Sequence, residues 1–563
     1  MVSKQKQKDF KQFSFALIAL LSFNIISQLF FGRIDFTAEK RYTLSPISKN
    51  ILQNLKQPVI ITVYLEGDFP SGFKRLRNAT KDLLADFKAY GGSNIDYNFV
   101  DPSGGKTQEQ QQTFFNELYA KGIEATNLSV KTESGLTQKT IIPAALVSFD
   151  GREIPVKLLQ SRMGLSPEEV LNNSVQNLEF AFAAAIKKIT TGGKPRLAFT
   201  VGHNELSDLQ LKDAAKGLSD GYDVGRVDLS KVPFTELEKI KLLIIAKPET
   251  EFTEAEKFKL DQYLMRGGKI FWAIDQVNAD LDSIKKGRSQ QLALANKLNL
   301  DDQLFKYGIR INYDLIGDMN CGQIPVSVGN VGGEAQIQMV PWLFNPIIMP
   351  TIAHPIIKNM DGIKTQFANT IDIIEVKNVT KTVLLTTSPY NRELKIPTMV
   401  ALDMIEETPD PKQFQSAPKA VCLLLEGQFA SDFTNRPIPT GISESISILP
   451  KSKTTKMLVF SDGDILRSDI SEKDGSVYPL GYDRFMQQTF GNRNFLLNVA
   501  DYLTDDSDLI NLRSKEIELR LLDKGLLVAQ KTKYQIINTV LPVLFVLIFA
   551  IFQHIYRKRK YAA

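Results

Sequence analysis

Two long apolar stretches without a charged residue lie near the ends of the sequence, at residues 13–31 and 535–553. Each has roughly the 20 residues that a helix needs to cross the hydrocarbon core of a bilayer. The first could instead be a cleaved signal peptide, but no small-residue cleavage site follows Phe31. The second could be a buried core helix, but a basic cluster follows it directly. The pattern therefore predicts two transmembrane helices.

Positive charge on the outer flanks of these stretches predicts the topology. The basic residues of the two tails, 1–12 and 554–563, are Lys4, Lys6, Lys8, Lys11 and the run Arg557–Lys560. Lys and Arg beside a spanning helix favour the cytoplasmic side of the membrane. We therefore expect a double-pass protein of the inner membrane, with both termini in the cytoplasm and the bulk of the chain in the periplasm.

After a linker at residues 32–56, residues 57–191 have the pattern of an α/β domain. β-Branched runs predict strands, and apolar residues at helical spacing predict helices. The expected elements are a strand at 59–65, a helix at 73–90, a strand at 95–100, a helix at 108–121, a hairpin of 141–149 with 153–158, and a helix at 166–190. This order is that of a thioredoxin-like domain. Because the redox motif Cys-x-x-Cys is missing, the domain is predicted to be a scaffold.

Residues 194–504 have the pattern of a larger α/β domain. The expected strands are 196–201, 241–247, 269–274, 420–426 and 456–462, and the expected helices are one ending near 218, then 253–266, 285–307 and 482–503. Apolar strands that alternate with helices predict a parallel sheet covered on both faces. The pattern assigns no order to residues 310–400, it predicts a loop at 431–453, and residues 505–534 connect this domain to the second span.

Composition changes this picture in two ways. The 563 residues include 68 Lys and Arg and 63 Asp and Glu, which gives a net charge of +5. The two basic tails carry more than this excess, so the sequence predicts no nucleic-acid-binding surface.

The two cysteines, Cys321 and Cys422, form no metal-binding motif. They could form one disulfide in an oxidising compartment, or they could be two separate buried thiols.

Candidate chemistry lies at the carboxyl ends of three predicted strands, where parallel sheets place ligand sites. The candidate residues are His203, Asn204, Glu205, Asp275, Asp462 and Asp464. His203 could act as a general base beside Glu205, and the two aspartates around Gly463 could hold a divalent cation. The alternatives are a helix-capping turn at Gly-His-Asn-Glu and an Asx turn at the aspartates. Together these strand ends predict a crevice that binds a ligand, without a catalytic role.

Several motifs of catalytic proteins are missing from the sequence. The chain contains neither the phosphate-binding motif GxxxxGK[ST] nor the nucleophile motif GxSxG, and neither cysteine lies at a strand-to-helix turn. Its three histidines are too few for a histidine-rich metal site. We therefore expect a protein that is not an enzyme and carries no metal or cofactor.

The order of the remaining motifs resembles one family. An amino-terminal anchor precedes the segment DFTAEKRYTLSPIS at 35–48, Gly-His-Asn-Glu at 202–205 follows a strand, and Gly-Gly-Lys at 267–269 precedes another. The segment GNRNFLLNVADYL at 491–503, Arg-Ser-Lys at 513–515 and a terminal span follow. Together these features resemble the GldG-type auxiliary, or "substrate-binding", component of the gliding-motility ABC transporters of Bacteroidetes.

The resemblance implies two partners, an ABC transporter ATPase subunit and a permease subunit, and a role in gliding motility and the associated secretion. It also implies that residues 194–504 are related in fold to class I glutamine amidotransferases, although the nucleophilic cysteine of those enzymes has no counterpart here. Family members often read Gly-His-Gly-Glu, so Asn204 replaces a glycine.

The expected function is therefore a non-enzymatic, membrane-anchored accessory subunit of an ABC transporter complex that couples or scaffolds on the periplasmic side. The first alternative is a periplasmic receptor that binds a solute near His203, Asp275 and Asp462 and delivers it to the permease. The second alternative is a membrane-tethered hydrolase, which lacks a visible nucleophile.

Overall fold

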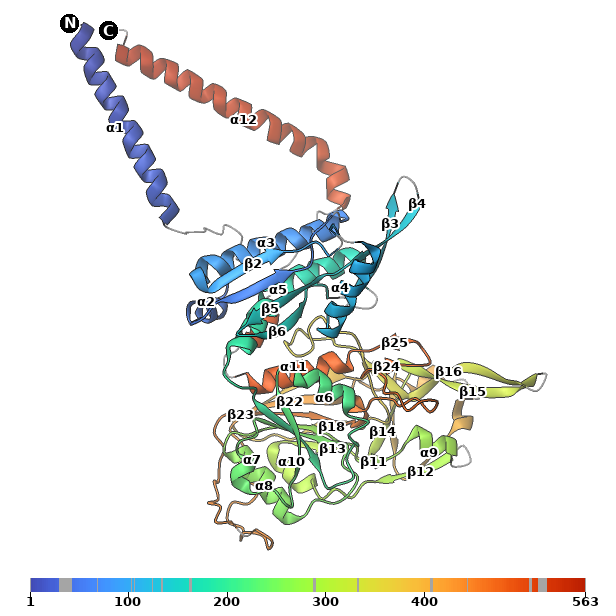
Figure 1. The fold of residues 1–563 in the computed structure, drawn as a ribbon. Helices are drawn as coiled ribbons and strands as arrows, with labels where there is room; N and C mark the ends of the chain where they lie inside the picture. Colours follow the sequence, from blue (N-terminus) through green and yellow to red (C-terminus); the bar gives the residue numbers. More distant parts are fainter. Residues whose placement is uncertain are drawn as a thin grey trace. The chain divides into compact units, whose positions relative to one another are not determined.

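The computed structural model describes residues 2–29, 43–67, 69–102, 104–105, 107–123, 125–132, 135–160, 165–286, 290–331, 334–405, 409–442, 444–505, 509–514 and 524–561. Contacts divide the chain into a large unit, residues 1–515, and a small unit, residues 516–563. The fold mixes helices with several separate β-sheets (Figure 1).

The small unit contains helix α12 (Lys524–Tyr561). Within its segment Gln530–Arg559, an apolar window of 18 residues has a mean hydropathy of 2.4 and none of it is buried, so this helix is long and apolar enough to cross a membrane. Helix α1 (Val2–Leu29) of the large unit has a shorter apolar segment, Phe10–Asn24, among its described side chains. The end of the predicted first span, residues 30 and 31, lies outside the described residues. Within the described ranges, one helix, at the C-terminal end, is thus both long and apolar enough to be a span.

A four-stranded sheet in the order β2-β1-β5-β6 forms the first part of the large unit. Its strands are β1 (Val59–Val63), β2 (Ile95–Phe99), β5 (Ala144–Phe149) and β6 (Arg152–Lys157). Strands β1 and β2 are parallel, whereas β5 runs antiparallel to both β1 and β6. Each of these strands lies where the apolar runs of the sequence predict it.

Helices cover both faces of this sheet. The helices are α2 (Pro46–Gln53), α3 (Ser71–Gly91), α4 (Gln108–Ala120) and α5 (Pro167–Thr190). Side chains of α3 and α5 pack with Ala145 and Val147 of β5, and Leu118 of α4 packs with Ala144 and Leu146 of the same strand. Alternate residues of a strand face opposite sides, so the two cores lie on opposite faces. A hairpin that the sequence pattern did not predict, β3 (Thr126–Thr132) with β4 (Gly135–Ile141), precedes β5.

A seven-stranded sheet in the order β19-β22-β23-β10-β9-β7-β8 forms the core of the second part. Its strands are β7 (Arg196–Val201), β8 (Asp223–Asp228), β9 (Leu242–Ala246), β10 (Lys269–Ala273), β19 (Val379–Thr386), β22 (Ala420–Gly427) and β23 (Thr455–Phe460). The five strands from β23 to β8 are parallel, as the pattern predicts, but β22 and β19 continue the sheet antiparallel.

Two hydrophobic cores sandwich this sheet (Figure 1). One contains side chains of α6 (Lys212–Ser219) and α11 (Asn492–Thr504), and the other contains side chains of α7 (Phe234–Leu237), α8 (Glu254–Met265) and α10 (Asp301–Tyr307). Residues of β9 alternate between the two cores, with Leu242, Ile244 and Ala246 in the first. Burial on both faces is the reason why β9 is apolar throughout.

Apart from α10 and β19, which belong with the large sheet, residues 277–401 form small antiparallel sheets, and this range includes the stretch without a predicted order. The elements are β11 (Val277–Asn278), α9 (Leu281–Lys286), β12 (Gln290–Ala295), β13 (Ile309–Ile311), β14 (Asp314–Asp318), β15 (Cys321–Val331), β16 (Glu334–Ile348), β17 (Ile363–Lys364), β18 (Ile371–Ile373), β20 (Asn391–Lys395) and β21 (Thr398–Ala401). Trp342, Phe344 and Phe367 form the aromatic centre of the hydrophobic core beneath them.

Two predicted helices were right only in part. The stretch 285–307 contains the end of α9, strand β12 and helix α10, because β12 pairs with the distant β21. In 482–503, the short strands β24 (Tyr482–Asp483) and β25 (Gln488–Thr489) pair first, and helix α11 begins only after Gly491. At β12 tertiary pairing overrides the local helical pattern, whereas at β24 and β25 a short local hairpin replaces the start of the predicted helix.

The two cysteines are not paired. Cys321 is half-buried on β15, and Cys422 is buried on β22 in the core of the large sheet. Burial raises the pKa of both thiols. The structure thus favours two separate thiols over a disulfide.

Candidate functional site

The carboxyl ends of the parallel strands carry the candidate residues. Asp275 follows β10, Asp462 follows β23, and Asp464 begins a short 3-10 helix, Asp464–Leu466. Since β10 and β23 are neighbours in the sheet, these ends meet. One carboxylate oxygen from each of the three aspartates lies within 4.8 Å of the others, and all three side chains are buried. We call Asp275, Asp462, Asp464 and the adjacent Lys247 the strand-end cluster.

Lys247 is the cation of the strand-end cluster. It follows β9, and its Nζ lies 2.5 Å from Oδ2 of Asp464 and 3.1 Å from Oδ2 of Asp275. Gly463 permits this approach, because a Cβ there would collide with the Cβ of Lys247. A divalent cation would have to displace the ammonium group from between two carboxylates. The chain therefore supplies its own counter-ion at the position that the sequence assigned to a ligand.

Backbone groups complete the cluster. The two carboxylate oxygens of Asp462 accept hydrogen bonds from the backbone N–H groups of Gln366 and Asp464, both at 2.7 Å. Oδ1 of Asp275 accepts one from Gly463 at 2.6 Å. These bonds fix loops from three parts of the chain around one point.

Burial is the main influence on the pKa values of the cluster. Burial raises the pKa of the Asp275 carboxyl to about 6, although the Lys247 ammonium opposes the rise. Burial, together with the charges of Asp275 and Asp464, raises the pKa of Asp462 well above its ordinary value. Burial lowers the pKa of Lys247, but the two carboxylates outweigh it, so Lys247 stays charged at neutral pH.

Arg467 extends the cluster towards the surface. Its guanidinium lies 3.4 Å from a carboxylate oxygen of Asp464, 3.0 Å from one of Asp280 and 3.1 Å from one of Asp282. Acidic and basic groups therefore alternate from the buried strand ends to the loop that follows β11. This arrangement links the large sheet to the small antiparallel sheets.

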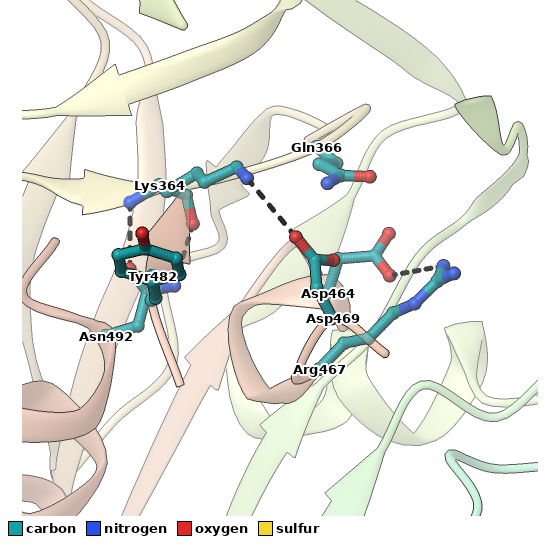
Figure 2. Close-up of a pocket in the computed structure, with 8 residues that line it drawn as sticks. Lys364, Gln366, Asp464, Arg467, Asp469, Tyr482 and Asn492 are labelled. Carbon is teal, nitrogen blue, oxygen red and sulfur yellow. Dashed lines mark hydrogen bonds and ion pairs between the residues drawn. The ribbon is translucent and has the colours of Figure 1, made fainter. Parts of the chain in front are cut away.

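Two small adjoining pockets lie beside Arg467, with volumes of about 20 and 40 Å³. They share Lys364, Gln366, Arg467 and Asp469 as lining residues, and Figure 2 shows the smaller one. Lys364 Nζ is held 2.9 Å from Asp483, and Asn492 bonds to the backbone of Lys364. Pockets of this size hold an ion or a few water molecules.

His203, Asn204 and Glu205 form a separate group in the turn after β7. Nε2 of His203 lies 3.2 Å from Oε2 of Glu256, and its Nδ1 lies 3.6 Å from Oε1 of Glu205, which is an ion-pair distance rather than a hydrogen bond. The imidazole stacks on Phe252 with ring centroids 3.7 Å apart. Glu256 also closes the capping box of α8 with Thr253. His203 therefore joins the turn after β7 to the start of α8.

This environment keeps His203 charged. Burial lowers its pKa, but its interactions with Glu205 and Glu256 outweigh burial and raise the pKa to about 9. The same pairing holds the pKa of Glu256 at about 2, against the effect of burial. A general base must be neutral before it accepts a proton. A His203 imidazolium paired with two carboxylates is therefore better suited to an ionic crosslink than to general-base catalysis.

The backbone at Asn204 has a conformation that favours glycine. Its φ is +60°, in the left-handed region, and the preceding Gly202 has a φ of +121°. The Asn204 amide donates to Glu249 at 2.5 Å. Asparagine tolerates this conformation better than other residues with a Cβ, so the tight turn persists without a second glycine.

We expect Asn204→Gly to change the free energy of unfolding by less than about 1 kcal/mol, because glycine adopts φ > 0 freely. Asn204→Val is expected to lower it by about 1–3 kcal/mol, because a β-branched residue is strained there. Urea unfolding of the full chain in detergent, followed by tryptophan fluorescence, measures both. Asn116→Val, on an exposed face of α4, is the control and should change the free energy of unfolding little. Equal losses for Asn204→Val and Asn116→Val would contradict the explanation by backbone strain at Asn204.

The sequence located the aspartates but missed their partners. The structure brings Asp275, Asp462 and Asp464 together, whereas it pairs His203 with both Glu205 and Glu256. Lys247, which directly follows the apolar run Leu242–Ala246, satisfied the same strand-end criterion that selected the aspartates. Lys364 carried no local signal, because Asp483 lies far along the chain. Arg467 was also missed: Asp464 is only three residues away, but Asp280 and Asp282 are distant.

These features define a mixed α/β protein with a central, mainly parallel sheet, an internally neutralised strand-end cluster and one apolar helix of membrane-spanning length among the described residues. A family described as an ABC-type uncharacterized transport system matches residues 194–499. The match covers more than half of the chain, so the chain belongs to this family and is an auxiliary component of an ABC-type transport system. A domain family of unknown function matches residues 38–148.

Two further similarities span much of the chain. An uncharacterized protein of Borreliella burgdorferi is 21% identical over 564 residues, which cover 97% of this chain and 96% of that protein. Among solved structures, the mmIFT52 N-terminal domain aligns at 14% identity with a TM-score of 0.31 over 55% of this chain and 97% of that domain.

Proposed function

We propose that this chain is a non-enzymatic, membrane-anchored accessory subunit of an ABC transporter, partnered by an ATPase and a permease and acting in gliding motility and secretion. Its α/β region would couple or scaffold on the periplasmic side. The observation that carries this proposal is the strand-end cluster: Lys247 and Arg467 of the chain itself occupy the sheet edge where an α/β protein would place a ligand.

The flanks of α12 support the proposed topology. Tyr534 and Tyr556 are separated by 22 residues, about 33 Å along a helix, which matches the thickness of a hydrocarbon core. Lys531 and Lys533 precede this stretch, but the run Arg557–Lys560 after it is more basic. The positive-inside tendency therefore favours a cytoplasmic C-terminus. We further propose that α1 is the second span.

The sheet of residues 57–191 supports a scaffolding role for this part of the chain. The order and directions of β2-β1-β5-β6 are those of a thioredoxin-like sheet, and Cys-x-x-Cys is missing from the sequence. We propose this relationship for residues 57–191 and an amidotransferase-like one for residues 194–504. Neither assignment includes a catalytic cysteine.

A solute receptor is the second candidate, and the larger pocket favours it. Oδ1 of Asn345 and Nε of Arg484 line this pocket, and both atoms are buried without a hydrogen-bond partner among the described residues. A small polar solute or water could satisfy them. Under our proposal, Arg484→Gln leaves transport unchanged; a selective loss of transport with an intact complex would favour the receptor.

Purification of the tagged full chain from native membranes in mild detergent tests the partnership. We expect an ATPase and a multi-span permease to be recovered in fixed ratio with the chain. Recovery of neither protein would reject the proposal.

The topology has its own test. A C-terminal tag should resist protease added outside spheroplasts. The double variant Leu544→Arg/Leu547→Arg should make the tag accessible to the protease. Each arginine at the centre of a span costs about 2.5–3.5 kcal/mol, so α12 should fail to insert into the membrane. Ile555→Arg, next to the basic run, is the matched control and should stay protected. A tag cleaved in the unmodified chain would contradict the topology.

A further inference from the structure

The circumference of α12 is not uniformly apolar. Between residues 535 and 553, every residue other than Ile, Leu, Val or Phe belongs to a single set: Gln535, Asn538, Thr539, Pro542, Ala550 and Gln553. Successive residues of an α-helix are rotated by about 100°. On this geometry the whole set falls within one sector about 120° wide, which we call the polar sector. Val546 and Phe549 share the sector, and all residues outside it are Ile, Leu, Val or Phe.

The polar sector presents hydrogen-bonding groups that lipid cannot satisfy. Its side chains are exposed in the structure. The Thr539 hydroxyl donates to the Gln535 carbonyl at 2.8 Å, whereas an amide such as that of Asn538 offers both donors and an acceptor. Residue 542 is a proline within the helix, so the Asn538 carbonyl lacks its usual helical N–H donor. Such groups in a spanning helix face protein rather than lipid.

We propose that the polar sector is the surface through which α12 pairs with α12 of a second copy of this chain, in parallel orientation. This inference rests on the membrane-spanning role of α12 proposed above. In a parallel two-fold pair, identical residues lie at the same depth. Because amides both donate and accept, each Asn538 and Gln535 can satisfy its own counterpart, and no charge within 535–553 opposes the contact.

Two features of the sector fit close helix pairing. Ala550 is small, which lets helix backbones approach, as is common at helix interfaces in membranes. A single asparagine at a helix interface also fixes register and favours one oligomeric state. The broad face of Ile, Leu, Val and Phe would then remain in contact with lipid.

Disulfide crosslinking of the full chain in lipid vesicles tests the proposal. In a Cys321→Ser/Cys422→Ser background, Thr539→Cys places a thiol in the polar sector while keeping Asn538. Ile537→Cys lies only about 3 Å away along the axis but on the opposite side of the helix. With a mild oxidant, we expect a covalent dimer for Thr539→Cys and at least fivefold less for Ile537→Cys.

A second measurement avoids the cysteines. Energy transfer between labelled copies in vesicles of varied lipid-to-protein ratio gives the dimer dissociation constant. Asn538→Leu is expected to raise it by about 3- to 30-fold, the range for lost hydrogen bonds between membrane helices. Val540→Leu, outside the sector, is the control and should leave it unchanged.

The outcomes separate this inference from the proposed function. Equal crosslinking at residues 537 and 539, no crosslinking at either, or an unchanged dissociation constant for Asn538→Leu would each overturn the pairing while leaving the anchor intact. Crosslinking of Thr539→Cys in native membranes only to a different polypeptide would assign the sector to that partner and also overturn it. A chain that alkaline carbonate releases from vesicles would refute the anchor itself.

Discussion

Lys247→Met is expected to lower the free energy of unfolding by about 3–5 kcal/mol, the range for removing one partner of a buried ion pair. Methionine keeps much of the volume of lysine but leaves Asp275 and Asp464 buried without their shared cation. Urea unfolding of the full chain in detergent measures the loss. Trp272, buried on β10 shortly before Asp275, serves as the fluorescent probe of unfolding.

The loss should depend on pH. Burial already raises the pKa of Asp275 to about 6, above its unfolded value, so its unfavourable contribution grows as pH rises from about 4 through 6. Without the ammonium group, which lowers it, the pKa of Asp275 rises further. The deficit of Lys247→Met should therefore be largest above pH 7 and shrink towards pH 5, where the carboxyls take up protons.

A surface ion pair provides the control. Lys231 pairs with Asp228 at 2.7 Å, but its side chain is 81% exposed. Lys231→Met should leave the free energy of unfolding nearly unchanged, because exposed ion pairs are screened by solvent. Similar losses for Lys231→Met and Lys247→Met would contradict the role assigned to the strand-end cluster.

In the Lys247→Met variant, a divalent cation that restores stability would indicate that the ammonium replaces a metal.

Raising the pH from 6.5 to above 9 is expected to remove about 3 kcal/mol of stability through His203. Its folded pKa of about 9 lies above the unfolded value of about 6.5, and each unit corresponds to about 1.4 kcal/mol. A raised pKa stabilises the fold fully below 6.5, and this contribution is lost as pH rises through 9. His203→Gln should remove this part of the pH dependence.

His354→Gln is the matched control for that experiment. Burial lowers the pKa of His354, so this histidine titrates below the window in which His203 acts. The slope between pH 6.5 and 9 should therefore be the same in His354→Gln and the unmodified chain. An unchanged slope in His203→Gln would refute the ionic crosslink between the turn after β7 and helix α8.

Local sequence predicted elements whose neighbours are close in the chain or whose burial is complete. The apolar run of β9 and the capping box Thr253–Glu256 of α8 are examples, since each carries its own signal. It failed at β12, whose residues Gln290–Ala295 form a strand only because β21, from a much later part of the chain, lies beside them. Pairing over such distances leaves no local pattern.

Local sequence was enough to predict the apolar helix at the C-terminal end, four of the five parallel strands of the large sheet and the acidic residues at two of their ends; β8 was not predicted. Periodicity, length and strand polarity are properties of short segments, so they can be read locally. The role of those acidic residues depends on contacts that form only in the folded chain. Lys247 reaches Asp275 and Asp464 from a separate segment of the chain, and burial dominates the pKa values of Asp275 and Asp462. A cluster that the sequence assigned to a ligand is thereby neutralised within the chain.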